Sequence, residues 1–249
     1  GELEGITVAP PPVTLTGRSV VADGSTLRSG KAHLLLCDQS DMTVGVADGA
    51  SPWIVTDNAP AIVAGTGGEN ARSKTPERMV TTCTHTLTGG AFGGATRLVK
   101  QGEGVLVLPN VTENHSGPTD IWNGTLRFDG TMAKSPVWLN RHTRLVSRGG
   151  HFLGGLRADY NATLLPGDDG VGSLSASRLD LGIGARVVFD IVNACPDTLN
   201  VDTLVLQTKD WGEYGPKYKA PVFEFRIQGE LPDGDYTLGR VDSLRGRLA

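Results

Sequence analysis

Short apolar segments alternate with polar turns along most of the chain. Two of them, Val105–Leu108 and Thr125–Phe128, each follow a glycine, Gly104 or Gly124. The segment between them is rich in Asn, Ser, Gly and Pro, whose backbone preferences favour turns. A pattern that returns about every twenty residues is typical of a solenoid, in which successive coils of the chain stack on each other.

The same rhythm continues through the C-terminal half. Leu179 and Leu181 flank Asp180, and such alternation with a period of two residues predicts strands with one buried and one solvated face. No window of about a dozen residues shows a helical period, so the sequence predicts an all-β protein. The further strands expected in this half are Val137–Leu139, Thr163–Leu165, Arg178–Leu181, Val187–Val192, Leu204–Leu206, Val222–Ile227 and Tyr236–Leu238.

The first ninety residues follow a less regular pattern. Residues 1–12 end in three prolines, which cannot donate to a sheet and favour extended geometry, so we interpret them as a linker. Short β segments alternate with Asp-Gly turns from residue 13 to about 63, which fits either the first turns of a solenoid or a sandwich-like cap. The loop-like residues 65–78 are interpreted as an excursion. The expected strands are Val13–Leu15, Ser19–Val21, Lys31–Leu36, Met42–Val46 and Trp53–Val55.

Two motifs follow each other in a fixed order after residue 99. They are Lys100-x-Gly102-x-Gly104-x-Leu106-x-Leu108 and Gly117-x-Thr119-x-Ile121-x-x-Gly124-Thr125-Leu126. This series resembles the passenger-associated repeat of bacterial autotransporters. The resemblance implies a single-stranded right-handed parallel β-helix, with corners made by Gly and Asn.

The later part of the chain extends this resemblance. Motifs within Ala162–Asp202 and the ending at Gly234–Gly246 are similar to the segments that follow such repeats toward the C-terminal end of a passenger. The resemblance therefore covers roughly Gly93 to Ala249. Comparable repeats are similar to accessory modules in large secreted proteins of Bacteroides-like bacteria, many of which act on polysaccharides.

These patterns divide the chain into three expected parts. Residues 1–12 form the linker, and residues 13–92 form the first β-helical turns or an irregular β cap at the N-terminus. Residues 93–249 form the parallel β-helix, with the charged tail Arg240–Ala249 as a C-terminal cap. The rival architecture, a pair of antiparallel sandwiches, leaves the Gly-Thr-Leu spacing unexplained.

Composition and charge narrow the range of partners. The chain has 34 glycines among 249 residues and only 6% aromatics, which suits tight turns around a narrow aliphatic interior. Its net charge of −4 predicts no attraction to nucleic acid or anionic membranes. No apolar stretch approaches the roughly 18–20 residues of a membrane helix. The chain opens at Gly1-Glu2, so we expect a piece of a longer protein, with that protein's other domains as partners.

The cysteines and histidines give no metal or cofactor motif. Cys37, Cys83 and Cys195 are widely spaced and form no CxxC pair. We interpret Cys37 as a small buried hydrophobe, and one disulfide with a free thiol stays open. The five histidines show neither HExxH nor the spacing of a triad. We therefore expect no cofactor and no bound metal.

Aspartates provide the main enzymatic alternative. A β-helical polysaccharide lyase or hydrolase needs two or three carboxylates on adjacent turns. Such carboxylates, if stacked on one face, could also bind a cation. We interpret them instead as turn formers and solvated side chains, so the sequence predicts no catalytic residue and no enzyme. The aspartates in question are Asp168, Asp169, Asp180, Asp190, Asp197 and Asp202.

Aromatic residues provide the candidate binding site. Trp211, Tyr214 and Tyr218 fall within the loop-like segment Asp210–Lys219, where flat rings could stack on sugar rings or contact a neighbouring domain. Trp122 and Trp138 lie within strand-like segments, and we interpret those two as packing residues.

Taken together, these patterns predict a non-catalytic β-helical module of a secreted or surface-exposed bacterial protein. It would act as a rigid spacer, adhesion or accessory domain on the extracellular side of the outer membrane, in weak contact with polysaccharide or cell-surface glycan. The alternatives are a polysaccharide-degrading β-helix enzyme and a dedicated carbohydrate-binding module.

Overall fold

A computed structural model shows that the described part of the chain consists of β-strands and turns, with no helix and hence no helix that could cross a membrane. The structure describes the strands of the first hundred residues and most of the chain thereafter. The described residues are 13–15, 18–21, 27–29, 34–36, 42–46, 53–55, 62–66, 84–88, 92–93, 98–102, 104–108, 112–113, 115–168, 170–207 and 220–246.

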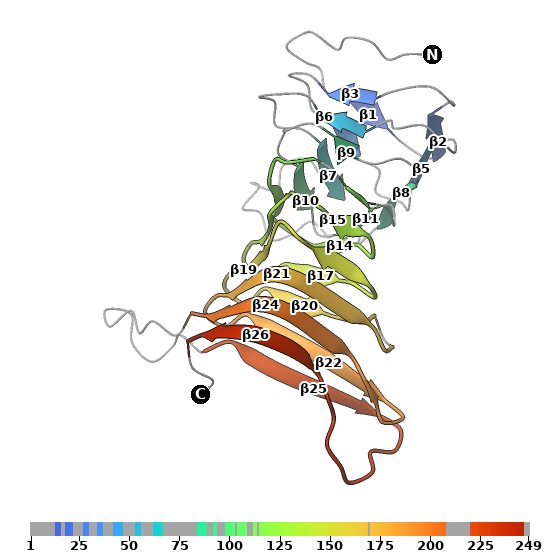
Figure 1. Ribbon diagram of the computed structural model, residues 1–249. Helices are drawn as coiled ribbons and strands as arrows, with labels where there is room; N and C mark the ends of the chain where they lie inside the picture. The colour runs from blue at the N-terminus through green and yellow to red at the C-terminus, as the bar shows by residue number, and fades with distance from the viewer. Residues whose placement is uncertain are drawn as a thin grey trace, which may run out of the picture.

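The strands stack in the order of the sequence. From β1 to β18, each strand except β9 pairs with the third strand after it, so that β1, β4, β7 and β10 are consecutive neighbours in one sheet. Of the pairings between described strands, only β22 with β23 is antiparallel. The blue-to-red colours of Figure 1 therefore run along the stack. This arrangement is compatible with a parallel β-helix and excludes two antiparallel sandwiches.

Two large sheets and one small one result. The first contains β1 Val13–Leu15, β4 Leu34–Leu36, β7 Ile62–Thr66, β10 Leu98–Gly102, β12 Thr112–Glu113, β13 Thr119–Ile121, β15 Thr131–Met132, β16 Val137–Leu139, β18 Gly150–Phe152, β19 Leu156–Ala158, β21 Ser173–Leu181, β24 Thr198–Leu206 and β26 Gly239–Arg245. The second contains β2 Arg18–Val21, β5 Met42–Val46, β8 Thr84–Thr88, β11 Val105–Val107, β14 Thr125–Arg127, β17 Arg144–Val146, β20 Thr163–Leu165, β22 Arg186–Val192, β23 Cys195–Pro196 and β25 Val222–Gln228. The small sheet contains β3 Leu27–Ser29, β6 Trp53–Val55 and β9 Phe92–Gly93.

The coils change shape along the stack. Up to β20, each coil contributes three short strands. From β21 onward one long strand replaces two of them, because β21 pairs with β18 through its first half and with β19 through its second half. The strands toward the red end of Figure 1 are accordingly longer. The coil thus widens from three short sides to two long ones.

Aliphatic ladders fill the interior. Leu106, Leu126, Leu145 and Leu164 occupy equivalent positions on consecutive strands of the second sheet, and all four are buried. Val187 continues this ladder on β22. The inward positions expected at Leu106, Leu108, Leu126 and Phe128 are confirmed by their burial. Because each side chain packs on its equivalents in the strands before and after it, the core runs the length of the stack.

Left-handed backbone conformations recur at one corner. His142, Asn161 and Gly184 have φ values of 60°, 56° and 68°, and each lies two residues before a strand of the second sheet. Glycine and asparagine tolerate this conformation best, in agreement with the expected corners. A Cβ atom added at Gly184 would lie only 2.3 Å from Asn161 Oδ1, so stacked corners also leave no space there for a side chain.

The strand predictions differ from the structure in identifiable places. Val137–Leu139 and Thr163–Leu165 coincide with β16 and β20. Tyr236–Leu238 was predicted as a strand, but strand β26 begins only at Gly239, because the Pro-Asp-Gly sequence before it forms an exposed bend. Within the expected cap Arg240–Ala249, residues up to Arg245 belong to β26, which pairs with β24 and extends the first sheet.

Candidate binding face

The aromatic loop expected to bind sugar cannot be placed on the fold. Trp211, Tyr214 and Tyr218 all lie outside the described residues. Their assignment as ligand-binding residues stays a prediction.

Two other tryptophans do lie on the surface. Trp122 is 40% exposed and Trp138 is 42% exposed, although both were interpreted as packing residues. That interpretation is wrong for a simple reason. Trp138 stands between the buried Val137 and Leu139 in β16, and the period-two alternation of a strand directs its side chain away from the interior. The signal was therefore present in the sequence.

Strand register brings these rings onto one outer face. Asp120 of β13, Trp138 of β16 and Arg157 of β19 occupy equivalent positions on neighbouring strands. Trp122 lies just past the end of β13, and its amide N–H donates to the carbonyl of Lys100 at 2.8 Å. The main-chain N–H of Asn140 donates to the carbonyl of Ile121 in the same way. Asn140 therefore occupies, after β16, the position that Trp122 occupies after β13. The two rings thus belong to adjacent strands of one sheet.

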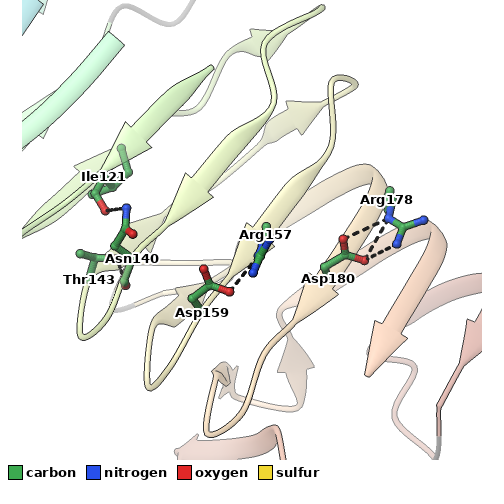
Figure 2. Close-up of polar contacts among 7 residues, drawn as sticks. All are labelled: Ile121, Asn140, Thr143, Arg157, Asp159, Arg178 and Asp180. Carbon is green, nitrogen blue, oxygen red and sulfur yellow. Dashed lines mark hydrogen bonds and ion pairs between the residues drawn. The ribbon is translucent and has the colours of Figure 1, made fainter. Parts of the chain in front are cut away.

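Polar pairs continue this face over the next strands. Arg157 Nε lies 2.8 Å from Asp159 Oδ1, and Arg178 Nε lies 2.9 and 3.1 Å from the two carboxylate oxygens of Asp180. In each pair the two residues are separated by one position, so both side chains stand on the same side of the strand. Figure 2 shows the two pairs side by side, with Asn140 just past the end of the preceding strand β16.

Asn140 fixes the edge of the face. Its side-chain amide donates a hydrogen bond to the main-chain carbonyl of Ile121 at 3.1 Å. The main-chain carbonyl of Asn140 accepts a hydrogen bond from Thr143 Oγ1 at 2.7 Å (Figure 2). These bonds hold the turn before β17. The exposed ion pairs themselves contribute little to stability, because solvent screens them and the long arginines lose entropy on pairing.

This face has the chemistry of a sugar-contacting surface. Indole rings offer flat apolar area that stacks on the C–H face of a pyranose, and the neighbouring guanidinium and carboxylate groups can exchange hydrogen bonds with hydroxyls. We call Trp122, Trp138, Arg157 and Asp159, with Arg178 and Asp180, the tryptophan face.

Among the described aspartates of the enzymatic alternative, only Asp190 and Asp197 lie together. Asp168 pairs with Arg127 and Arg148, whereas Asp180 pairs with Arg178 within β21 of the first sheet. Asp202 is exposed on β24, and Asp169 lies outside the described residues. Among the residues that the structure describes, no three His, Cys, Asp or Glu side chains could hold a metal ion together.

Asp190 and Asp197 are buried and hold the backbone together. Asp197 accepts hydrogen bonds from the amide of Gly172 at 2.7 Å and from the amide of Asp190 at 2.8 Å. Burial raises the pKa of the Asp197 carboxyl above its usual value, and the two backbone hydrogen bonds oppose that shift. Arg226 Nε lies 3.1 Å from Asp190 Oδ1. These contacts tie three segments of the chain to each other, which is a structural role.

Of the three cysteines, Cys195 is free and exposed at the start of β23. Cys37 and Cys83 lie outside the described residues, so the burial expected for Cys37 stays a prediction.

Fold and face together define an all-β protein of stacked parallel strands with an aromatic and polar outer surface. Comparisons of the chain with protein-family models, with curated proteins and with solved structures found no match. The resemblance to autotransporter passenger repeats stays a prediction from the motifs.

Proposed function

We propose that the chain is a right-handed parallel β-helix that serves as a non-catalytic module of a secreted or surface-exposed bacterial protein. The observation that carries this proposal is the continuous ladder of parallel strands from β1 to β26, with one aliphatic interior through its described core. A stack in which every coil pairs with the coils before and after it is stiff along its axis. Such an element suits a spacer that holds an adhesive or catalytic partner domain away from a surface.

The tryptophan face supplies the contact with glycan in this proposal. Trp138 is exposed on β16 and Trp122 is exposed directly after the neighbouring β13, and the hydrogen bonds of the sheet fix the main chain at both positions. A preorganised pair of rings binds repeating sugars with little loss of entropy. The site therefore favours polysaccharide or cell-surface glycan as the ligand, and it gives the module an accessory or adhesive role.

Binding to polysaccharides tests this proposal. The purified chain is titrated with a panel of neutral and acidic polysaccharides by calorimetry, and the same titration is repeated with Trp138→Ala. We expect binding that this substitution weakens by at least about tenfold, since an aromatic stacking partner is lost.

Leu153→Ala is the matched control. Leu153 is also exposed and lies in the turn between β18 and β19, and it is not one of the residues of the tryptophan face, so its truncation removes apolar surface but neither ring. It is expected to bind like the parent chain. Loss of binding in Trp211→Ala with full binding in Trp138→Ala would move the site to the loop around Trp211. Absence of binding to every polysaccharide would contradict the glycan-contacting role.

A further inference from the structure

Within the part of the chain that the structure describes, the apolar interior is open at the C-terminal end of the stack. Phe225 and Ile227 of β25 continue the positions of Phe189 and Ile191 of β22, because the two strands pair in parallel register. Phe189 and Ile191 are 3% and 5% exposed, whereas Phe225 and Ile227 are 48% and 53% exposed. The same type of position thus changes from buried to half-exposed at the last coil.

The other sheet ends in the same way. Val241 and Leu244 of β26 continue the positions of the buried Val201 and Leu204 of β24, and both are exposed. Within the described part of the chain, β25 pairs only with β22 and β26 only with β24. Figure 1 places both strands at the end of the stack. Two strand edges and the side chains between them therefore form one end surface.

Among the residues that the structure describes, strand β25 carries neither of two devices that commonly prevent edge-to-edge pairing. Proline, or a charged residue that points toward the interior, would block an incoming strand. The inward positions of β25 are Phe223, Phe225 and Ile227, all of them apolar. Its charged residues, Glu224 and Arg226, lie on the opposite face of the strand. An approaching strand would meet free backbone groups and an apolar interior at the same time.

We propose that this end binds a second copy of the chain, by antiparallel pairing of the two β25 strands about a two-fold axis at Phe225. The sequence of β25, VFEFRIQ, complements itself in this register. Phe225 lies opposite Phe225 of the second copy, and Phe223 lies opposite its Ile227. On the other face, Glu224 lies opposite Arg226 of the second copy, twice by symmetry. Opposite charges and apolar pairs directly across a ladder both stabilise it.

The charges favour the antiparallel arrangement over a parallel one. Parallel pairing of two β25 strands in register sets Glu224 against Glu224 and Arg226 against Arg226, which is repulsive. Within one copy Glu224 already contacts Arg186, and Arg226 lies beside Asp190. In the two-fold arrangement, Arg226 of the second copy joins the pair of Glu224 and Arg186, and Glu224 of the second copy joins the pair of Arg226 and Asp190. A two-fold interface is also closed, so association stops at the dimer.

Strand β26 complements itself in the same way about Val241, one residue before its central residue Asp242. Antiparallel pairing centred on Val241 sets Arg240 of one copy opposite Asp242 of the other, and Val241 opposite Val241. Both edge strands of the end surface are therefore compatible with a second copy in a two-fold arrangement.

Sedimentation velocity over a series of protein concentrations tests the proposal. The parent chain is expected to sediment as a dimer at high concentration. Ile227→Lys places an inward-pointing charge opposite Phe223 of the second copy, and we expect it to weaken self-association by about a hundredfold, because that charge would be buried without a partner. Gln228→Lys is the control, since it makes the same change of charge at the next residue on the opposite face.

Each alternative outcome overturns the proposal. A parent chain that is monomeric at every concentration means that no second copy covers this end. Equal weakening by both lysine variants means that the interior side of β25 is not in the interface. Species that grow beyond the dimer indicate head-to-tail stacking instead. Far-UV circular dichroism on both variants shows that the fold is retained, and hydrogen exchange of the β25 amides above and below the dimerisation range locates the protected strand.

Discussion

A short chain of hydrogen bonds fixes the protonation state and the tautomer of the buried His115. Ser135 Oγ donates to the carbonyl of Gly117 at 2.7 Å, so Thr119 Oγ1, 2.9 Å away, must donate to Ser135. His115 Nε2 lies 2.9 Å from Thr119 Oγ1 and is therefore the donor in that contact. A neutral imidazole with its proton on Nε2 satisfies this chain of hydrogen bonds. Burial lowers the pKa of His115 to about 4.

This pKa predicts how stability depends on pH. The folded pKa lies below the value of 6.5 expected for the unfolded chain, so the unfolded state binds more protons between these two values. The contribution of His115 to stability is complete above pH 6.5 and is lost as the pH falls toward about 4. The loss is about 3 kcal/mol. In urea unfolding, His115→Gln is expected to remove this part of the pH dependence.

Ser135→Ala separates the stability that comes from the hydrogen bonds of Ser135 from the pH dependence that comes from His115. It removes the hydrogen bonds of Ser135 Oγ with Gly117 and Thr119 and costs about 1–3 kcal/mol, but it leaves the imidazole in place. Its stability should therefore fall with acidification as in the parent chain. If His115→Gln and the parent chain lose the same stability between neutral pH and pH near 4, the pKa of His115 is not depressed in the folded state.

At the scale of the strand, stability comes from very few inward residues. In β17 the burial pattern is one exposed arginine followed by two buried apolar residues. Leu145 is fully buried and packs between the equivalent Leu126 and Leu164. Each coil therefore depends on a small number of contacts above and below.

Leu145→Ala tests this ladder. A cavity between two neighbouring coils cannot close without moving both strands, so we expect a loss of about 2–5 kcal/mol in the free energy of unfolding. Arg144→Ala, on the same strand but exposed, should change it by less than about 0.5 kcal/mol. Equal effects of the two substitutions would show that Leu145 does not lie in the core.

Apolar content explains which of the short strands could be predicted from the sequence. Val137–Leu139 and Val187–Val192 carry enough apolar residues to stand out, and both lie in strands. Strands β18 and β19, Gly-His-Phe and Leu-Arg-Ala, were not predicted. A strand of three residues with a charged or polar centre has no alternation to detect. Only its pairing with the strands before and after it in the stack makes it a strand.

At the scale of the molecule, the repeating coil predicts which deletions are tolerated. Val137 of β16 is in register with Leu156 of β19, so residues 137–155 make up one complete coil with β16, β17 and β18. Their removal lets β19 follow β15 and take the place of β16. Because pairing extends only to neighbouring coils, we expect the shortened chain to fold and to unfold cooperatively.

A deletion of part of a coil is the control. Removal of residues 137–146 takes away β16 and β17 but leaves β18, which would have to follow β15 directly and take the place of β16 beside β13, instead of its own place beside β15. This variant should show no cooperative thermal transition by circular dichroism. If instead both deletions unfold the chain, the coils do not act as interchangeable units.

The sequence by itself determined the β character, the repeat and the inward leucines, because period-two alternation and turn residues are local properties. It also contained the outward direction of Trp138. The alternation of the strand predicts that direction, but it is easily overlooked because Trp138 is itself apolar and lies between two apolar residues. Only the tertiary structure decided the parallel pairing of most strands with the third strand after them, the gathering of Trp122 and Trp138 on one face, and the exposed Phe225 and Ile227 at the end of the stack. These features depend on contacts between residues far apart in the chain, and no local pattern specifies which coil lies next to which or what lies beyond the last one.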